Sequence, residues 1–399
     1  MNIDISKRVE ELEESPTMAI MAKAKALRAE GKDIIGFTVG EPDFDTPGNI
    51  KEAAKRAIDE GHTKYTPVGG IPELKNAIIK KFQMDNSLEY RPEEILVSCG
   101  GKHSIYNLCQ AIIDPGDEVI IPSPYWVSFP PIVELAGGSA VIVETNDESG
   151  FKMSPAEFKA GITGRTKALI LNSPSNPTGS AYTLSELEEI AKIAIENKIL
   201  IISDEIYEKI VYDGFEFTSI ASISDEIKDQ TIVLNGVSKT YAMTGWRIGY
   251  AAGAEEVIRA MGKVQSQSTS NASSISQWAA VEAISGPQDA IDEMVGKFTE
   301  KRKIIVDGLN AIAGVECRSP QGAFYAFPNV SSFYGKKGKG KIIEGSADLA
   351  AYLLDFVEVA VVPGVAFGSD AHLRLSYACS IENITEGLKR IEKALNSLS

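Results

Sequence analysis

Histidine and cysteine are scarce in this chain of 399 residues, which has three histidines and four cysteines. The cysteines show neither a CxxC pair nor a metal-ligand spacing; they are Cys99, Cys109, Cys317 and Cys379. Metal centres need several such ligands at short spacing. We therefore expect no metal, and we expect reduced thiols in a cytoplasmic protein.

Long apolar runs are also missing. No uncharged apolar segment of 18 residues occurs, whereas a membrane-spanning helix needs about 20 such residues. The N-terminal stretch MNIDISKRVEELEESPTMAI is acidic and lacks the apolar run of a secretion signal. We expect a protein that does not enter a membrane and is not exported.

Positive charge is in deficit, since 55 acidic residues oppose 40 basic ones and the formal net charge is -15. Such a surface repels the phosphates of nucleic acids and anionic membranes. We expect no nucleic-acid partner, and any anionic ligand must be held by local cations. The hydrophobic content of 44% in 399 residues is enough for a large core and more than one domain.

Short apolar runs alternate with helical patterns through the middle of the chain. Each run ends in a loop, as expected for buried strands: EILVSC, DEVIIPS, SAVIVET, TKALILN, ILIISD, TIVLNG and WRIGYAAG. A helix over 184–198 fits between two of them as a crossover, with an apolar stripe of Leu184, Leu187, Ile190, Ile193 and Ile195. This order predicts a doubly wound, mostly parallel α/β sheet.

The C-terminal block reads strand, helix, strand, helix, and it predicts a second, smaller α/β domain. We expect this small domain at 289–399, beginning with a long charged helix, and a large domain at 49–288. An N-terminal segment at 1–48 would pack with the small domain through a helix that starts after Ser15 and Pro16. The lysine- and glycine-rich stretch 334–341 is expected to be a solvated loop.

Polar residues follow the predicted strands, at the sheet edge where open α/β folds bind ligands. Gly100, Gly101 and Lys102 come after the first strand and open a helix, which would present backbone N–H groups to an anion. A pair of glycines before a helix is also the pattern of an ordinary tight turn.

Four more side chains stand at the ends of later strands: Trp126, Asn176, Asp204 and Tyr207. Each has an ordinary interpretation, as a packed aromatic residue, a turn former or a helix cap. Their joint occurrence instead fits a planar, anionic, pyridine-like cofactor, which needs an aromatic plate, a carboxylate for its ring nitrogen and a lysine for its aldehyde. The stretch NGVSKTYAMTGWRIGY supplies the lysine, Lys239, and a phosphate-binding arginine, Arg247.

That stretch resembles the lysine signature of the class I aminotransferases, the aspartate aminotransferase family of fold-type I pyridoxal-phosphate enzymes. Other blocks resemble the family in the same order: GEPDFDTP, KYTPVGGIPELK, PSPYW, NSPSNPTG, SDEIYE and LRLSYA. The resemblance covers nearly the whole chain and is nearest to the bacterial and archaeal type. It implies the cofactor pyridoxal 5'-phosphate and ping-pong transfer of an amino group from an L-amino acid, aspartate, to a 2-oxo acid, 2-oxoglutarate.

The resemblance also implies a role for each matching residue. Lys239 would carry the cofactor aldehyde and move the substrate proton, with Asp204 and Tyr207 as the other catalytic residues. The residues implied to hold the cofactor are Lys239, Gly101, Lys102, Trp126, Asn176, Asp204, Tyr207, Ser238, Arg247 and Tyr65. Those implied to hold the substrate are Gly40, Trp126, Asn176, Arg374 and Lys102.

Three of these implied contacts go beyond the cofactor ring. Arg374 would clamp the α-carboxylate of the substrate, and Lys102 would bind the distal carboxylate of aspartate. Tyr65 would reach the phosphate of a neighbouring subunit, which implies a homodimer with shared sites.

Two positions depart from the family pattern. Many relatives have a hydroxyl three residues before the lysine as a phosphate ligand, whereas this chain has Gly236, which leaves Ser238 as the nearer candidate. Some relatives that accept prephenate have a lysine about where this chain has Glu13, which argues against that substrate.

Other functions stay open at this point. A carbon–sulfur lyase of the same fold would keep Lys239, Asp204 and Arg374, and related aminotransferases prefer alanine, aromatic or prephenate-type substrates. A transcription regulator built on this fold would need an extra N-terminal DNA-binding domain, for which the chain has no room. A nicotinamide dehydrogenase would need a glycine fingerprint with an acidic residue about 20 positions on, and no convincing case occurs.

Overall fold

The computed structural model describes residues 4–10, 12 and 16–399; Glu13 and Ser15, on which two expectations rest, lie outside the described residues. A seven-stranded sheet of the described chain has the order β2, β8, β7, β6, β5, β3, β4. The strands are β2 (Ile95–Ser98), β3 (Glu118–Ser123), β4 (Ser139–Glu144), β5 (Thr166–Asn172), β6 (Leu200–Asp204), β7 (Thr231–Gly236) and β8 (Gly249–Ala252). In this sheet β8 runs antiparallel to both of its neighbours, β2 and β7, and the other pairs of neighbouring strands are parallel. The predicted strands and the doubly wound, mostly parallel α/β fold are confirmed.

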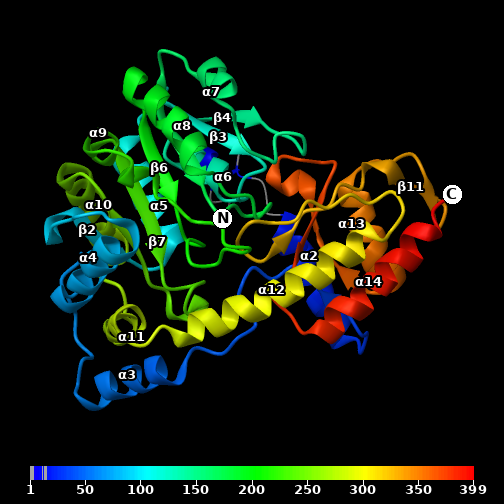
Figure 1. Ribbon diagram of the computed structural model, residues 1–399, viewed down its shortest axis with the longest axis horizontal. Coiled ribbons are helices and arrows are strands. Elements are labelled where there is room, and N and C mark those ends of the chain that lie inside the picture. The colour runs from blue at the N-terminus through cyan, green and yellow to red at the C-terminus, as the bar shows by residue number, and fades with distance from the viewer. Residues whose placement is uncertain (1–3, 11, 13–15) are drawn as a thin grey trace.

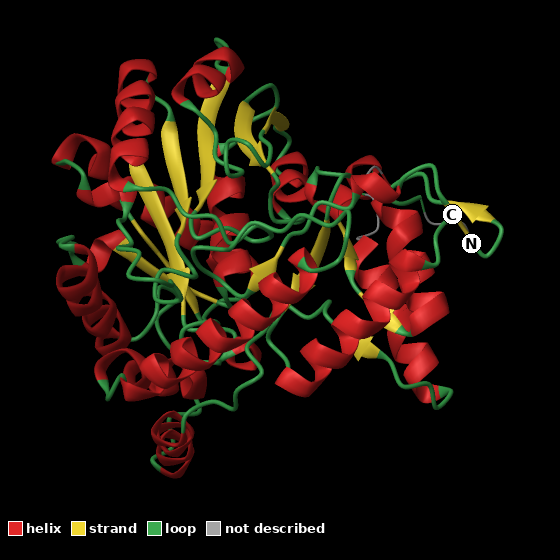
Figure 2. Ribbon diagram, turned by 45° about the vertical axis from the view of Figure 1, so that its right-hand side comes forward, coloured by secondary structure: helices red, strands yellow, loops and turns green. Residues whose placement is uncertain are grey.

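Helices cover both faces of this sheet (Figure 2). On one face lie α5 (Gly101–Ile112), α6 (Phe129–Leu135) and α10 (Glu255–Ser268). On the other lie α4 (Pro72–Asn86), α7 (Pro155–Gly161), α8 (Leu184–Asn197) and α11 (Ser274–Ser285). In β3, Val119 and Ile121 pack on the first face and Ile120 on the second. Strands buried on both sides in this way read as continuous apolar runs.

The apolar stripe of α8 differs from the prediction at its first residue. Leu187, Ile190 and Ile193 are buried, but Leu184 is 48% exposed. Thr183 caps this helix, so Leu184 lies in the first turn, and none of the hydrophobic clusters of the described chain includes it.

The C-terminal block forms a second, smaller α/β region beside the large sheet. Its antiparallel sheet has the order β13 (Val362–Pro363), β14 (Leu373–Ser376), β9 (Tyr325–Ala326). The helices α13 (Ser346–Val357) and α14 (Ile381–Asn396) belong to this region, and the long helix α12 (Asp289–Asn310) runs from the large sheet to it (Figure 1).

The N-terminal segment has three described elements, α1 (Lys7–Glu10), α2 (Pro16–Ala29) and β1 (Ile35–Gly36). Helix α1 contacts α6 of the large region, whereas β1 pairs in parallel with β12 (Val359–Ala360) of the small region. Ala24 of α2 belongs to one buried cluster with Leu354 of α13. The domain boundaries at 48 and 288 stay a prediction.

The stretch 334–341 was expected to be a loop, and this expectation is wrong. Lys337–Gly338 (β10) and Lys341–Ile342 (β11) form an antiparallel hairpin. The two residues between the strands, Lys339 and Gly340, have φ angles of 48° and 80°. A two-residue turn with positive φ at both positions matches the twist of paired strands, so the lysine- and glycine-rich sequence closes a hairpin.

The remaining elements are short or peripheral. They are the helices α3 (Gly48–Asp59) and α9 (Asp225–Asp229) and 3-10 turns at Pro92–Glu94, Ile220–Ser222, Thr244–Trp246, Ser331–Phe333 and Gly364–Phe367. Among the described helices none has the length and apolar character to cross a membrane. The described residues also contain no group of three or more His, Cys, Asp and Glu side chains placed to hold a metal ion.

Candidate active site

A cavity of about 590 Å³ lies at the carboxyl ends of β5, β6 and β7, against the small sheet. Its walls contain all the predicted site residues except Tyr65: Gly40, Gly101, Lys102, Trp126, Asn176, Asp204, Tyr207, Ser238, Lys239, Arg247 and Arg374. The positions come from every part of the chain, and the carboxyl edge of the sheet brings them together.

Lys239 lies in the turn after β7, with its amine deep in the protein. Its Nζ donates a hydrogen bond to the backbone oxygen of Gly40. The pKa of Lys239 is lowered to about 8, chiefly by burial; Glu41 and Asp204 oppose this shift, and Arg374 and Arg247 favour it. The neutral amine, which is the form that attacks a carbonyl carbon, is therefore far more populated near neutral pH than in an exposed lysine.

Asp204 is the last residue of β6 and lines the same cavity. Burial raises the pKa of its carboxyl to about 6, although the Ile206 N–H, 3.3 Å from Oδ1, and Lys239 favour the ionised form. A buried carboxylate costs free energy unless it is paired. A ligand that brings a cationic N–H group to Asp204 would remove this cost.

The start of α5 forms a cradle for an anion. Gly100 has a φ of 94°, and a Cβ on it would lie 2.4 Å from a guanidinium nitrogen of Arg247. A Cβ on Gly249 of β8 would lie 2.3 Å from the backbone nitrogen of Gly101. The backbone therefore approaches closely where Arg247 and the first N–H groups of α5 meet, which is a geometry that binds phosphate.

Lys102 and Trp126 face each other across one side of the cavity. The Nζ of Lys102 lies 4.8 Å from the centre of the Trp126 ring. Packing around the amine and the charge of Arg247 lower the pKa of Lys102. This cation is thus available to a ligand that extends beyond the ring of Trp126.

Arg374 reaches the cavity from β14 of the small sheet. Its guanidinium donates to Asn176 Oδ1 at 3.0 Å and to the Thr38 backbone oxygen at 2.7 Å. It lies between the rings of Tyr325 and Phe367, at 4.7 and 5.0 Å from their centres. Burial lowers the pKa of Arg374, and its Nε has no partner in the described chain. A carboxylate ligand would supply the missing charge and acceptor.

Tyr325 is a cavity residue that the sequence did not indicate. Its hydroxyl lies 2.8 Å from that of Tyr207, and it is fully buried. A Cβ on Gly40 would come within 2.9 Å of the Tyr325 hydroxyl, so a larger residue at position 40 would push into it. The other cavity residues missed from the sequence include Thr38, Asn172, Asn235 and Thr244.

Tyr65 lies outside the cavity, and its side chain is 92% exposed. The chain after it is fixed, because Gln265 Nε2 donates to the Val68 oxygen at 2.7 Å and Gln277 Nε2 to Thr66 Oγ1 at 3.0 Å. An exposed aromatic side chain on an anchored segment is presented to the outside of this subunit.

The glycine three residues before the signature lysine also has a structural explanation. A Cβ on Gly236 would lie 2.9 Å from the Ile248 backbone oxygen, so the space for a side chain is filled by the neighbouring strand. Ser238 lines the cavity instead.

The fold and the cavity together define a doubly wound α/β protein that surrounds a buried amine and a buried carboxylate with two arginines. The chain belongs to the aminotransferase class I and II family, whose model matches residues 32–391.

Individual relatives agree with this assignment. The chain is 53% identical to the aspartate aminotransferase of Bacillus sp. (strain YM-2), over 98% of both chains. It is 50% identical to the aspartate/prephenate aminotransferase of Cereibacter sphaeroides, over 99% of both.

Solved structures are similar over nearly all of the chain. The aspartate aminotransferase from Rhizobium meliloti has a TM-score of 0.97 at 46% identity, covering 100% of both chains. The Thermus thermophilus aspartate aminotransferase with maleate has a TM-score of 0.93 at 44% identity, covering 98% of this chain and 100% of that one.

Proposed function

We propose that the protein transfers an amino group from aspartate to 2-oxoglutarate, with pyridoxal 5'-phosphate held in the cavity at the carboxyl edge of the sheet. The observation that carries the proposal is that Lys239 and Asp204 face one cavity with perturbed pKa values of about 8 and about 6. The family match and the names of the relatives support the reaction.

The residues present fit the cofactor. Asp204 offers a buried carboxylate to a protonated ring nitrogen, Trp126 offers an aromatic face, and the start of α5 with Arg247 offers a phosphate cradle. Asn176 uses Oδ1 to accept from Arg374, so its Nδ2 is left to donate to the phenolic oxygen of the ring, together with the Tyr207 hydroxyl. When bound, the cofactor supplies an aldehyde for the amine and a ring that accepts electrons.

Lys239 would bind the aldehyde as a neutral amine, yield to the incoming substrate amine, and then act as the base that removes the proton from the substrate Cα. The Asp204 carboxylate would keep the ring nitrogen protonated, because an anion within about 4–6 Å favours the charged form. Arg374 would hold the α-carboxylate of the substrate and fix the Cα–H bond beside Lys239.

Substrate choice would depend on Lys102. A second carboxylate in a closed site needs a cation, and Arg374 is already assigned to the first one. Lys102, beside Trp126, would bind the distal carboxylate of aspartate.

Tyr65 would reach the phosphate of the partner subunit, which makes the working unit a homodimer. We also propose that the protein acts in the cytoplasm.

Lys102→Ala tests this assignment. The kcat/KM for aspartate should fall by about 10- to 1000-fold, because about 1.5–4 kcal/mol of charged hydrogen bonding is lost, while the value for alanine changes little. Equal losses for both donors would assign Lys102 to the phosphate. Arg374→Leu is the matched variant, since it should weaken both donors together.

Two other reactions are separated by simple assays. A carbon–sulfur lyase would release pyruvate from cystathionine without a 2-oxo acid acceptor, and the proposed enzyme would not. Prephenate as an amino acceptor is supported by the names of relatives at 49–50% identity, and amination of prephenate by aspartate would show it.

A further inference from the structure

The turn after β6 carries two pairs of side chains with different surroundings. Asp204 and Tyr207 line the cavity, whereas Glu205 and Glu208 are 1% and 5% exposed and do not line it. The two pairs have the same spacing, and the turn is closed by the Glu208 N–H, which donates to the Glu205 oxygen at 3.0 Å. The position of the cavity pair therefore depends on what holds the buried pair.

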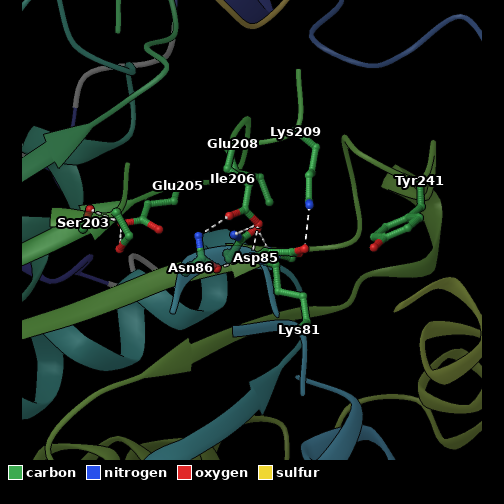
Figure 3. A network of polar contacts seen from close by, with 12 residues as sticks. Lys81, Asp85, Asn86, Ser203, Glu205, Ile206, Glu208, Lys209 and Tyr241 are labelled. Carbon is green, nitrogen blue, oxygen red and sulfur yellow. Dashed lines mark hydrogen bonds and ion pairs between the residues drawn. The ribbon is translucent and has the colours of Figure 1, made fainter. Parts of the chain in front are cut away.

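Glu208 is held by donors from two other segments (Figure 3). Lys81 of α4 forms an ion pair with Oε1, and Asn86 Nδ2 donates to Oε2 at 3.0 Å. Asn235 Nδ2 donates to Oε1 at 2.7 Å. Lys81 is 7% exposed and also donates to Asn86 Oδ1 at 2.7 Å. The buried Glu208 carboxylate thus has a charged and a neutral donor on one oxygen and a neutral donor on the other, and these contacts fix its orientation.

A second ion pair ties the same helix to the same turn. Lys209, the next residue after Glu208, lies 2.8 Å from Asp85 Oδ1, and Lys81 lies 3.7 Å from Asp85 Oδ2. Figure 3 shows these contacts converging between α4 and the turn. The end of α4 and the turn after β6 are thus joined as one unit.

Asn235 extends this unit to the reactive lysine. It lies in β7, lines the cavity, and its Oδ1 accepts from the Gly236 N–H at 2.7 Å. Glu208 therefore links the segment that carries Asp204 to the segment that leads into Lys239.

We propose that Glu208, anchored by Lys81, is a positioning residue that sets the separation between the Asp204 carboxylate and the Lys239 amine. These are the two groups that a pyridine ring with an aldehyde must meet together, so Glu208 determines how tightly the cavity binds the cofactor. The inference rests on the proposed function. The competing role is attachment of α4 to the sheet, which would affect folding stability and leave the cavity unchanged.

The test compares Glu208→Gln with Glu118→Gln in the protein freed of cofactor. Glu118 is 6% exposed, accepts from Thr163 Oγ1 at 2.5 Å, pairs with Arg165, and lies at the start of β3, outside the cavity. The Kd for pyridoxal 5'-phosphate is measured by quenching of tryptophan fluorescence, and the Tm by calorimetry.

Both variants should lower the Tm, but only Glu208→Gln should raise the Kd, on the order of 10- to 100-fold for a misplaced pair of contacts. The pH midpoint of the absorbance change of the bound cofactor should also shift only in Glu208→Gln. Lys81→Arg, which keeps the positive charge, should bind more tightly than Lys81→Met.

A Glu208→Gln protein with a lowered Tm and a wild-type Kd would overturn the inference. If that variant does not fold, the comparison of Lys81→Arg with Lys81→Met takes its place; a Kd equal to that of the wild type in both would be equally decisive against the inference. A wild-type protein that binds no pyridoxal 5'-phosphate would instead refute the proposed function, which is a separate result.

Discussion

Lys81 is a buried lysine and Lys239 a lysine that lines the cavity, and their amines meet different partners. The Lys81 amine pairs with the Glu208 carboxylate, whereas the Lys239 amine donates to the backbone oxygen of Gly40. A carbonyl dipole does not offset the loss of water as a full negative charge does, and burial lowers the pKa of Lys239 to about 8. The partner, rather than burial alone, separates a lysine that holds the fold from one that can react.

Replacement of Lys239 should produce the largest effect. Lys239→Ala should lower transamination of aspartate on the order of 10³-fold or more, because both the amine for the aldehyde and the base for the Cα proton are removed. The steady-state assay checks this, and the purified variant should lose the yellow colour of the imine-bound cofactor. Lys301→Met is the control: Lys301 is a buried lysine paired with Asp43 at 2.6 Å. Comparable activity of the Lys239→Ala and Lys301→Met variants would show that Lys239 is not a reactive lysine distinct from the buried structural lysines.

Replacement of Lys81 should act mainly on stability. Lys81→Met leaves Glu208 buried without its cation, and breaking a buried pair in this way costs about 3–5 kcal/mol of unfolding free energy. Urea unfolding of the cofactor-free protein measures the change. A loss below about 1 kcal/mol, as for an exposed pair, would show that the network carries little of the fold.

Replacement of Lys239 should have the opposite sign on stability. The pKa of Lys239 is about 8 in the folded protein against 10.5 for an ordinary lysine, so the folded state bears the cost of the charge below pH 8. This cost fades as the pH rises from about 8 towards 10.5. Lys239→Met without cofactor should therefore be more stable than wild type at pH 7, by about 1–3 kcal/mol. Unfolding at pH 7 and above pH 10 checks the sign, since the difference should disappear at the higher pH.

The smallest effect is expected at the neutral contacts of the cavity. Tyr325→Phe removes the hydroxyl that lies 2.8 Å from Tyr207. The net value of such a bond is about 0.5–1.5 kcal/mol, so kcat/KM for aspartate should fall by about 10-fold or less. A loss as large as that of Lys239→Ala would mean that the hydroxyl pair, and not the amine, controls the chemistry.

The strands could be predicted from the sequence because helices cover both faces of the large sheet. Strands buried on both faces consist of continuous apolar runs, such as ALILN, which are easily recognised. The sequence predicted Lys239 and Asp204 because each follows such a run within a family motif. The prediction that Leu184 belongs to the buried stripe of α8 was wrong, because the helical period of apolar residues does not show at which residue the helix begins to contact the sheet.

The network around Glu208 was not predicted, for a physical reason. Lys81 and Asn86 lie in the polar sequence KKFQMDN, whose composition is typical of an exposed helix end. Their burial depends on a turn more than 100 residues away in the chain, with Asn86 and Glu208 separated by 122 positions. Tyr325 was not predicted as a cavity residue, because only the packing of the small sheet against Thr38 and Asn176 brings it there.

The antiparallel strand β8 has a consequence for how the chain is made. Ser98, just before the glycines of the phosphate cradle, pairs with Gly249, so β2 has no sheet neighbour until β8 has been synthesised. At about 5–20 residues per second, the intervening stretch of roughly 150 residues takes on the order of 10–30 s on a ribosome. During this time the backbone N–H and C=O groups of β2 have no strand partner, and the phosphate cradle does not yet exist. The proposed cofactor could therefore stabilise only a nearly finished large region, and we expect that nascent chains stalled before residue 252 do not retain it.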